Sequence, residues 1–328
     1  MNSYEYLLDL ALILLSTKVL GLLTRRVCMP QVVGALLAGL ILGPACLGVL
    51  KGTEFIHQVS EIGVIVLMFC AGLETDIQEL KRTGKASFII AFLGVLVPLA
   101  GGFGIAWIFN RPGMIESTAT ASIMLQNIFI GVILTATSVS ITVETLKEMG
   151  KLNTKAGNAI LGAAIIDDIL GIIALTIITS LADSSVNVWM VFVKILGFFV
   201  FVGVGGYLIH TLFQKWVKGY ERDLRRFVII AFVICLIFSY CAEKFFGVAD
   251  ITGAFFAGLI ITNTTHTNYI ERRFGILSYI LLSPVFFASI GIQVELPKMD
   301  AMLLLFAVLL VIVAVLTKVV GCGLGAKL

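Results

Sequence analysis

Long apolar stretches alternate with short polar connections along almost the whole chain. A stretch of about 20 apolar residues lets an α-helix cross a bilayer, and at these lengths helices are the only plausible spanning structures. The pattern therefore predicts eleven membrane-spanning helices and an all-α polytopic membrane protein. Their predicted bounds are 6–24, 30–50, 58–76, 86–109, 117–147, 154–181, 187–216, 224–244, 248–263, 274–294 and 301–326.

Composition agrees with this class and removes several others. Of the 328 residues, 59% are hydrophobic and only 13% are charged, too few to cover a soluble protein of this length. The six cysteines lie mostly inside apolar stretches and show no metal-ligand spacing. No cofactor is expected. The basic residues lie between the apolar stretches, so the net charge of +3 carries no indication of a nucleic-acid partner, and none is expected. The expected environment is the lipid bilayer.

Basic residues predict the orientation. Of the 23 Lys and Arg, 16 lie in the connections after odd-numbered segments or at the C-terminal end, and four lie on the opposite side. Cytoplasmic loops carry the excess of positive charge, so the N-terminus is expected outside. The expected location is the inner (plasma) membrane, crossed many times.

An internal repeat relates two parts of the chain. The segment GALLAGLIL at 34–42 returns as GAFFAGLII at 253–261, an offset of 219 residues that also carries Gly72 onto Gly291. The two copies start seven spans apart, an odd number, so they would cross the membrane in opposite directions. Inverted repeats of this kind are typical of secondary transporters, whose site lies where the repeats meet.

The repeat also predicts that the sequence is truncated. The counterpart of Asp168 would lie beyond the last residue, so roughly 60 residues and two helices of the second repeat are expected to be missing. The eleven segments would then be eleven of about 13.

Two adjacent acids occupy the middle of an apolar stretch. Asp167 and Asp168 stand within ILGAAIIDDILGIIALTII (160–178), and each costs about 2.5–3.5 kcal/mol at the centre of a spanning helix. They point about 100° apart, so one can face an ion cavity while the other meets a partner on another helix. The alternative is a pair kept only for helix packing, but acids inside membranes are functional by default.

A stretch rich in hydroxyl residues is predicted to interrupt the fifth segment. TATSVSITVET (135–145) contains β-branched and hydroxyl residues that favour helix poorly, in a segment longer than a straight span needs. We expect an unwound stretch over Thr135–Val139 whose carbonyls, with the Thr137 and Ser138 hydroxyls, could bind a small cation. The alternative is an intact helix whose hydroxyls bond to its own carbonyls.

A lysine in the last segment is the candidate partner of the acids. Lys318, in AVLTKVVGCGLGAK (314–327), follows about ten apolar residues of its span, and an unpaired ammonium there would be costly. The alternative is that Lys318 snorkels to the interface, which is also the interpretation of Lys18 and Lys194.

These motifs resemble those of the cation/proton antiporters, in the branch of NapA-type sodium/proton antiporters and KefC-type potassium efflux systems. The resemblance covers the whole chain. It rests on MPQVVGALLAGLILGP, MFCAGLE, TATSVSITVETLKEMGKLNTKAGNAILGAAIIDDILGI, SPVFFASIGIQ and KVVGCGLGAK. KefC-like members usually carry glutamine before the ion-binding aspartate, so the DD pair favours the electrogenic sodium/proton type.

The resemblance implies a homodimer with dimerisation and core domains, the core moving like an elevator. Dimerisation helices would fall in 1–82 and 221–297, core helices in 83–181 and 298–328, and a linker helix in 182–220. It also implies roles for site residues. Asp168 would bind the ion, Asp167 would pair with Lys318, and Na⁺ would be held by Asp168, Asp167, Thr137 and Ser138.

The predicted function is exchange of Na⁺ or Li⁺ for H⁺, without enzymatic activity. Loss of water favours the neutral form of a carboxyl group, so protons and Na⁺ can compete for Asp168. The main alternative is a K⁺/H⁺ antiporter or a gated potassium efflux protein. An intramembrane aspartyl protease needs two facing carboxylates, which neighbours on one helix cannot provide. A sodium-coupled symporter for organic solutes would need a larger polar cavity.

Overall fold

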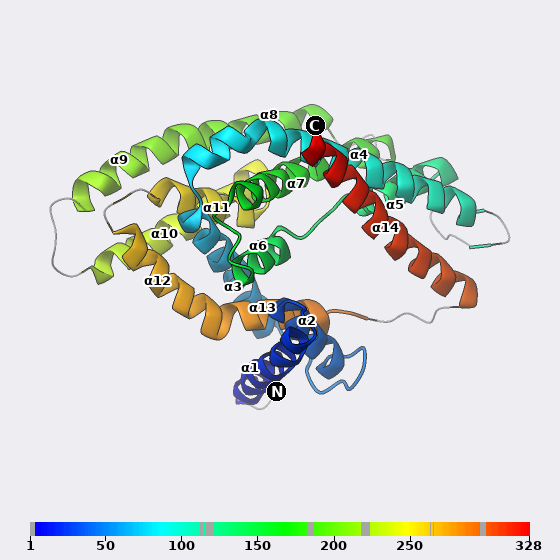
Figure 1. Cartoon of the computed structure of the whole chain (residues 1–328), viewed down its shortest axis with the longest axis horizontal. Coiled ribbons are helices and arrows are strands. Elements are labelled where there is room, and N and C mark those ends of the chain that lie inside the picture. Colours follow the sequence, from blue (N-terminus) through cyan, green and yellow to red (C-terminus); the bar gives the residue numbers. More distant parts are fainter. Residues whose placement is uncertain are drawn as a thin grey trace. The chain divides into compact units, whose positions relative to one another are not determined.

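The computed structural model describes residues 4–111, 114–115, 121–182, 187–217, 224–262, 264, 266–295 and 300–328. The predicted domain boundaries at 220/221 and 297/298 lie outside these residues. Contacts divide the chain into two units (Figure 1). The first comprises Met1–Asp76, Ser140–Asn153 and Phe198–Leu296, and the second comprises Ile77–Val139, Thr154–Gly197 and Pro297–Leu328.

The first unit contains most of the helices. They are α1 (Glu5–Arg26), α2 (Gln31–Leu42), α3 (Glu54–Glu74), α6 (Val139–Glu148), α9 (Gly206–Val217), α10 (Arg225–Cys241), α11 (Asp250–Ile261), α12 (Thr267–Leu277) and α13 (Ser283–Ile292). Three π-helical turns lie within its longer spans: η1 (Phe201–Gly205), η2 (Ala242–Phe246) and η3 (Ser278–Leu282). The closest packing joins α3 to α11, α1 to α2 and α2 to α13.

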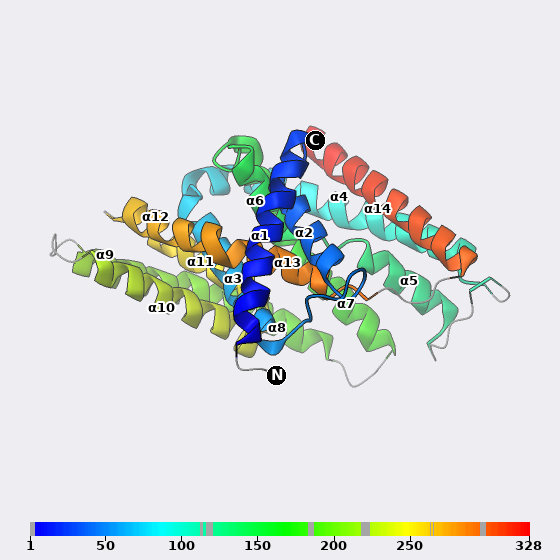
Figure 2. The same cartoon turned by 90° about the horizontal axis from the view of Figure 1, so that it is seen from below.

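The second unit is built on two long helices that run beside each other, α4 (Ile77–Phe109) and α14 (Ala301–Lys327) (Figure 2). α7 (Lys155–Ala182) packs against α4, and the short α5 (Ile123–Ile133) contacts both α4 and α7. Most of α8 (Val188–Val200) also belongs to this unit. The acid pair and Lys318 therefore lie in the same unit.

The described helices follow most of the predicted segments closely, although α4 begins at Ile77 and not at 86. Eight are long and apolar enough to cross a membrane, and the other three segments contain the shorter apolar helices α2, α5 and α11. The tenth segment begins at Thr267 rather than at 274, because its first turns carry the polar run TNYIERR, which hydropathy does not count as a span.

The second predicted segment is too long at its C-terminal end. It was expected over 30–50, but α2 ends at Leu42, and Gly43 leaves the helical region with φ −76° and ψ −177°. Pro44 follows directly, and a proline disfavours the helical conformation of the residue before it. The apolar residues that follow Pro44 therefore belong to a non-helical connection.

Matching glycine contacts support the internal repeat. A Cβ added to Gly39 would lie 1.9 Å from the Ala288 carbonyl oxygen, and one added to Gly258 would lie 2.3 Å from that of Phe69. Both the glycines and their partners differ by 219 in residue number. The same holds for Gly72 on Phe255 and Gly291 on Leu36, whose carbonyl oxygens would lie 2.1 and 2.4 Å away. The two copies thus use equivalent residues to bring helix backbones together.

These contacts predict a large effect of one methyl group. Gly72→Ala should destabilise the protein by several kcal/mol, about 2 to 4, because the clash is with backbone atoms that cannot move aside cheaply. Gly104→Ala is the matched control, since nothing lies within 4 Å of the added Cβ in helix α4. Thermal unfolding in detergent measures both. Equal midpoints for the two variants would contradict this packing.

Candidate functional site

The acid pair lies on α7, which is fixed against α4. The Ser87 hydroxyl donates to the Ala159 carbonyl at 3.1 Å, and Gly162 leaves room for Ser87 beside the helix. This contact places the middle of α7, with Asp167 and Asp168, within the second unit.

The fifth segment is interrupted where the sequence predicts it. α5 ends at Ile133 and α6 begins at Val139, so 134–138 are not helical. The predicted unwound stretch ended one residue later, at Val139, which is already helical. The Thr135 hydroxyl donates to the Val132 carbonyl at 2.7 Å and closes the end of α5. Side-chain bonds of this kind offer the backbone an alternative to continuing a helix.

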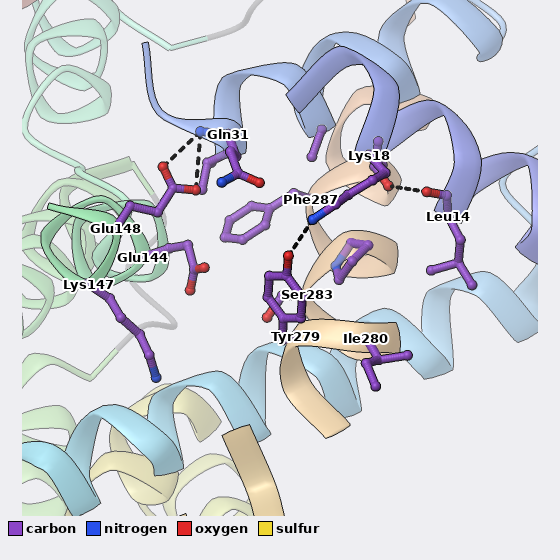
Figure 3. A pocket seen from close by; sticks show the side chains of 14 residues that line it. Leu14, Lys18, Gln31, Glu144, Lys147, Glu148, Tyr279, Ile280, Ser283 and Phe287 are labelled. Carbon is purple, nitrogen blue, oxygen red and sulfur yellow. Dashed lines mark hydrogen bonds between the residues drawn. The ribbon is translucent and has the colours of Figure 1, made fainter. Parts of the chain in front are cut away.

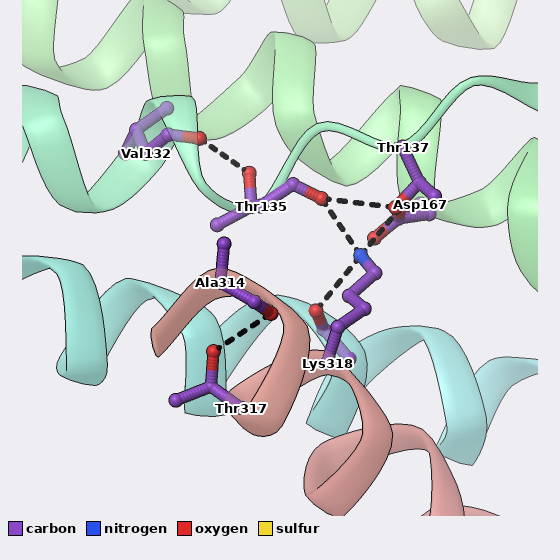
Figure 4. Close-up of polar contacts among 8 residues, drawn as sticks. Val132, Thr135, Thr137, Asp167, Ala314, Thr317 and Lys318 are labelled. Atoms are coloured by element: carbon purple, nitrogen blue, oxygen red, sulfur yellow. Dashed lines mark hydrogen bonds and ion pairs between the residues drawn. The ribbon is translucent and has the colours of Figure 1, made fainter. Parts of the chain in front are cut away.

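Lys318 uses all of its donors inside this site. Its ammonium donates to Asp167 Oδ2 at 2.9 Å, to the Thr135 carbonyl at 2.7 Å and to the Gly94 carbonyl at 3.0 Å (Figure 4). An ammonium has three N–H groups, and here each has an acceptor. The structure thus shows Lys318 paired with Asp167, not extended towards an interface.

Both carbonyl acceptors lack the N–H donor that a regular helix would supply four residues later. Thr135 lies beyond the end of α5. Gly94 lies four residues before Pro98 in α4, and proline has no N–H to bond the carbonyl of residue i−4. Sequence reasoning missed Gly94, although a proline inside a predicted span marks a carbonyl in need of another donor.

Asp167 is almost fully buried, and only one of its two carboxylate oxygens accepts hydrogen bonds from the described residues. Its Oδ2 accepts from Lys318 and, at 3.0 Å, from the Thr137 hydroxyl. Its Oδ1 is buried and has no hydrogen-bond partner among the described residues. Thr137 was expected to bind the cation together with Asp167, Asp168 and Ser138. The structure places its hydroxyl on Asp167, and Ser138 lies in the same non-helical stretch.

Asp168 differs sharply from its neighbour. It is half-buried, and its carboxylate makes no hydrogen bond or ion pair with the described residues. With both acids ionised and Lys318 charged, the three side chains sum to one negative charge. A monovalent cation or a proton at Asp168 would neutralise the group, which favours occupancy in a medium of low dielectric constant.

The site offers only a few oxygen atoms as ligands for a cation. Among the described residues, no group of three or more His, Cys, Asp or Glu is placed to hold a metal ion. Ligands beyond the two carboxylates would therefore be hydroxyl groups and carbonyls of the non-helical stretch. Such hard, neutral oxygens suit an alkali cation that must leave again.

Comparison with known proteins decides the family. Residues 11–328 match the family described as sodium/hydrogen exchanger, transmembrane. The chain belongs to the sodium/hydrogen exchanger family. As a member of this family it is a transporter and not an enzyme.

Several curated relatives cover nearly the whole chain. A probable Na⁺/H⁺ antiporter of Bacillus cereus, GerT, is 40% identical over 98% of this chain and 82% of its own length. The Na⁺/H⁺-K⁺ antiporter GerN of the same organism is 38% identical over 99% of the chain and 81% of its length. An Na⁺/H⁺ antiporter of Enterococcus hirae is 36% identical over 98% and 82%.

A solved structure shares the fold. The sodium proton antiporter MjNhaP1 from Methanocaldococcus jannaschii superposes with a TM-score of 0.70 at 21% identity, covering 99% of this chain and 79% of that one. The exchanger described here is thus an all-helical polytopic membrane protein with an antiporter fold.

Proposed function

We propose that the protein exchanges Na⁺ or Li⁺ for H⁺ across the membrane, with Asp168 as the ion carrier. One observation carries the proposal: Asp168 is a half-buried carboxylate without a hydrogen bond or ion pair in the described part of the chain, next to a carboxylate that is already paired with Lys318. Relatives whose names state Na⁺/H⁺ antiport span the whole of this site at 36–40% identity. We assign the chain to the NapA-like branch of the family.

The exchange would need no energy source beyond the two gradients. Asp168 is neutral when it holds a proton, and Asp168 together with a bound Na⁺ is neutral as well. Either form therefore crosses a low-dielectric region at lower free-energy cost than the bare carboxylate. Two ions that compete for one carboxylate are exchanged, because each must leave before the other can bind. Carbonyls and hydroxyls of 134–138 would complete the shell around Na⁺.

The Asp167–Lys318 pair would neutralise the second acid while Na⁺ is absent. Its contact with the Thr135 carbonyl and the Thr137 hydroxyl couples the pair to the non-helical stretch. Na⁺ that bound here would compete with Lys318 for these oxygens. Two protons for each Na⁺, and hence net charge movement, are part of the proposal.

Further parts of the proposal concern the whole protein. We assign an N-terminus outside, a plasma-membrane location, a homodimer and an elevator-type movement of the core helices. Exchange of K⁺ for H⁺ is the second candidate function. GerN, at 38% identity, is named an Na⁺/H⁺-K⁺ antiporter, so that relative admits both cations.

Proteoliposomes test the function directly. The purified protein is reconstituted with a pH gradient and a fluorescent pH indicator, and Na⁺, Li⁺ or K⁺ is added separately. We expect Na⁺ and Li⁺ to collapse the gradient. A response to K⁺ alone would favour the second candidate, and no response to any of the three cations would contradict both.

The hydroxyl of Thr137 should contribute to the site through Asp167. Thr137→Val keeps the side-chain shape but removes the 3.0 Å bond to Asp167 Oδ2. Loss of a hydrogen bond to a charged group costs about 1.5–3 kcal/mol, so we expect the Na⁺ concentration for half-maximal transport to rise about tenfold or more.

Thr317→Val is the matched control for this change. Thr317 precedes Lys318, but its hydroxyl bonds to the Val313 and Ala314 carbonyls of its own helix. We expect Na⁺ dependence within about twofold of the unchanged protein, since only a local helix bond is lost. If the two variants were shifted equally, Thr137 would have no special part in the site.

A further inference from the structure

A cavity of about 420 Å³ lies inside the first unit, whereas the acid pair belongs to the second. It is open to the surface and lined by α1, α2, α6 and the η3–α13 region, and residues such as Val32, Phe287 and Ile280 give it largely apolar walls (Figure 3). Four charged side chains also line it: Lys18 from α1 and Glu144, Lys147 and Glu148 from α6. Lys147 and Glu148 have partners within the first unit, so the charges of interest are Lys18 and Glu144. The antiport mechanism proposed above uses neither of these two.

Lys18 has donors to spare in this cavity. Its ammonium bonds to the Tyr279 hydroxyl, and it lies 4.7 Å from the centre of that ring. No carboxylate among the described residues forms an ion pair with it. Snorkelling was expected for Lys18, but its side chain is held by Tyr279 on the cavity wall. An ammonium has three N–H groups, so an anion could bind beside the phenol.

Glu144 makes no hydrogen bond or ion pair among the described residues, although the charge of Lys147, one turn along α6, acts on it. One turn later, both carboxylate oxygens of Glu148 accept from the Gln31 N–H at 2.8 and 3.1 Å. Lys147 pairs with Glu74. Glu144 itself is half-buried. Glu148 and Lys147 thus have partners in the protein, while the Glu144 carboxylate lines the cavity without a hydrogen bond from the described residues.

Lys18 and Glu144 line one cavity and do not pair with each other. A half-buried charge is stabilised by an opposite charge, and a ligand with both signs could serve both walls at once. We propose that this cavity binds the headgroup of a zwitterionic phospholipid that carries a primary amine. Lys18 and Tyr279 would hold the phosphate, and Glu144 would accept from the ammonium, in charge-assisted hydrogen bonds.

The surroundings of the cavity favour a lipid over a small soluble zwitterion. Tyr279 and Ile280 are each 60% exposed, so the cavity wall continues onto the apolar outer surface of the helices. Leu15 and Leu22, three and four residues from Lys18 on its own helix face, are 65% and 50% exposed. Acyl chains could lie along these side chains while the headgroup enters the cavity.

Headgroup-specific binding tests the proposal. Native mass spectrometry of the purified protein would compare phosphatidylethanolamine with phosphatidylglycerol of the same acyl chains. We expect phosphatidylethanolamine to bind about tenfold more tightly, the factor given by one additional good polar contact. Lys18→Met should weaken both lipids by about tenfold, because both carry a phosphate.

Glu144→Gln distinguishes recognition of the amine from recognition of the phosphate. It should reduce phosphatidylethanolamine binding to the level of phosphatidylglycerol and leave the latter unchanged, because only the amine contacts Glu144. Lys194→Met is the matched control, a lysine on the exposed face of α8 that does not line the cavity, and should change neither. If Lys18→Met fails to fold, Tyr279→Phe removes one phosphate donor and should weaken both lipids.

Several outcomes would overturn the proposal. Equal binding of the two lipids by the unchanged protein, or a preference for phosphatidylglycerol, would show that Glu144 recognises no amine. Displacement of the lipid by an equal concentration of free phosphoethanolamine would indicate a soluble ligand. Binding only to monomers would indicate that a second copy of the chain covers the cavity. Because binding is measured without transport, these results are independent of the antiport proposal.

Discussion

Asp168→Asn should abolish the exchange of both Na⁺ and H⁺ in proteoliposomes, while the protein remains folded. An amide binds no proton in the working pH range and has no charge to hold Na⁺, so both halves of the exchange are lost together. Asp168 makes no hydrogen bond or ion pair with the described residues, so its replacement breaks no internal contact. Removal of one half-buried, unpaired charge should leave the free energy of unfolding unchanged or slightly raised.

The measurement therefore has two readouts with different expected results. Cation-dependent collapse of a pH gradient should fall to the level of empty liposomes, and the thermal midpoint in detergent should not fall. Asp9→Asn, an acid on α1 in the first unit, is the control and should transport normally. Residual proton movement driven by Na⁺ in Asp168→Asn would show that another group carries the ion.

The sequence predicts this site as far as local patterns and the cost of charge in a membrane allow. The interrupted helix follows from the hydroxyl-rich run at 135–145, and the break is found at 134–138. The pairing of Lys318 with an acid follows because an isolated ammonium in a span is costly, and the structure shows the partner as Asp167. From the residues alone either aspartate could have been that partner; the assignment to Asp167 came from the resemblance.

Other features depend on packing that a single chain pattern does not contain. Thr137 is predicted to bind the cation with both acids, and the sequence does not say which acid its hydroxyl meets. In the structure the hydroxyl bonds to Asp167, which depends on the rotation of α7 against 134–138. The Gly94 carbonyl enters the site only because α4 and α14 lie side by side. Lys18 and Glu144, far apart in sequence, line one cavity of the first unit. No periodicity within one segment indicates such contacts.

The repeat shows where sequence and structure inform each other best. The offset of 219 was inferred from short apolar matches, which carry little chemistry by themselves. In the structure the matched glycines make matched backbone contacts, Gly39 on Ala288 and Gly258 on Phe69. Small residues at such crossings let helices approach closely in membranes. The same close approach therefore requires a glycine at the equivalent position of each copy. The transmembrane inversion of the two copies stays a prediction.

Asp167→Asn should have a different phenotype from Asp168→Asn, with a loss of stability as well as altered transport. The change removes the only carboxylate that pairs with Lys318 among the described residues, and leaves an ammonium facing two carbonyls and an amide. Breaking a buried ion pair from one side costs about 3–5 kcal/mol. Because the Lys318 side chain is 22% exposed, we expect the lower end, about 3 kcal/mol.

The charge left behind also predicts how transport changes. The lowest-cost response of an unpaired buried ammonium is to lose its proton, so Asp167→Asn would carry a neutral lysine through the cycle. Exchange should be weaker and should move no net charge, although some dependence on Na⁺ should remain because Asp168 is intact. Currents on a solid-supported membrane, recorded beside the pH signal, distinguish weak electroneutral exchange from complete inactivity.

The double variant Asp167→Asn with Lys318→Met completes the test. Lys318→Met alone should resemble Asp167→Asn, since it leaves the buried carboxylate unpaired. Removing both charges should recover most of the stability that either single change loses, because neither charge is then left without its partner. Equal, additive losses in the double variant would mean that the pair contributes nothing as a pair. If Asp167→Asn were silent and Lys318→Met behaved like Asp168→Asn, the two aspartates would have exchanged roles.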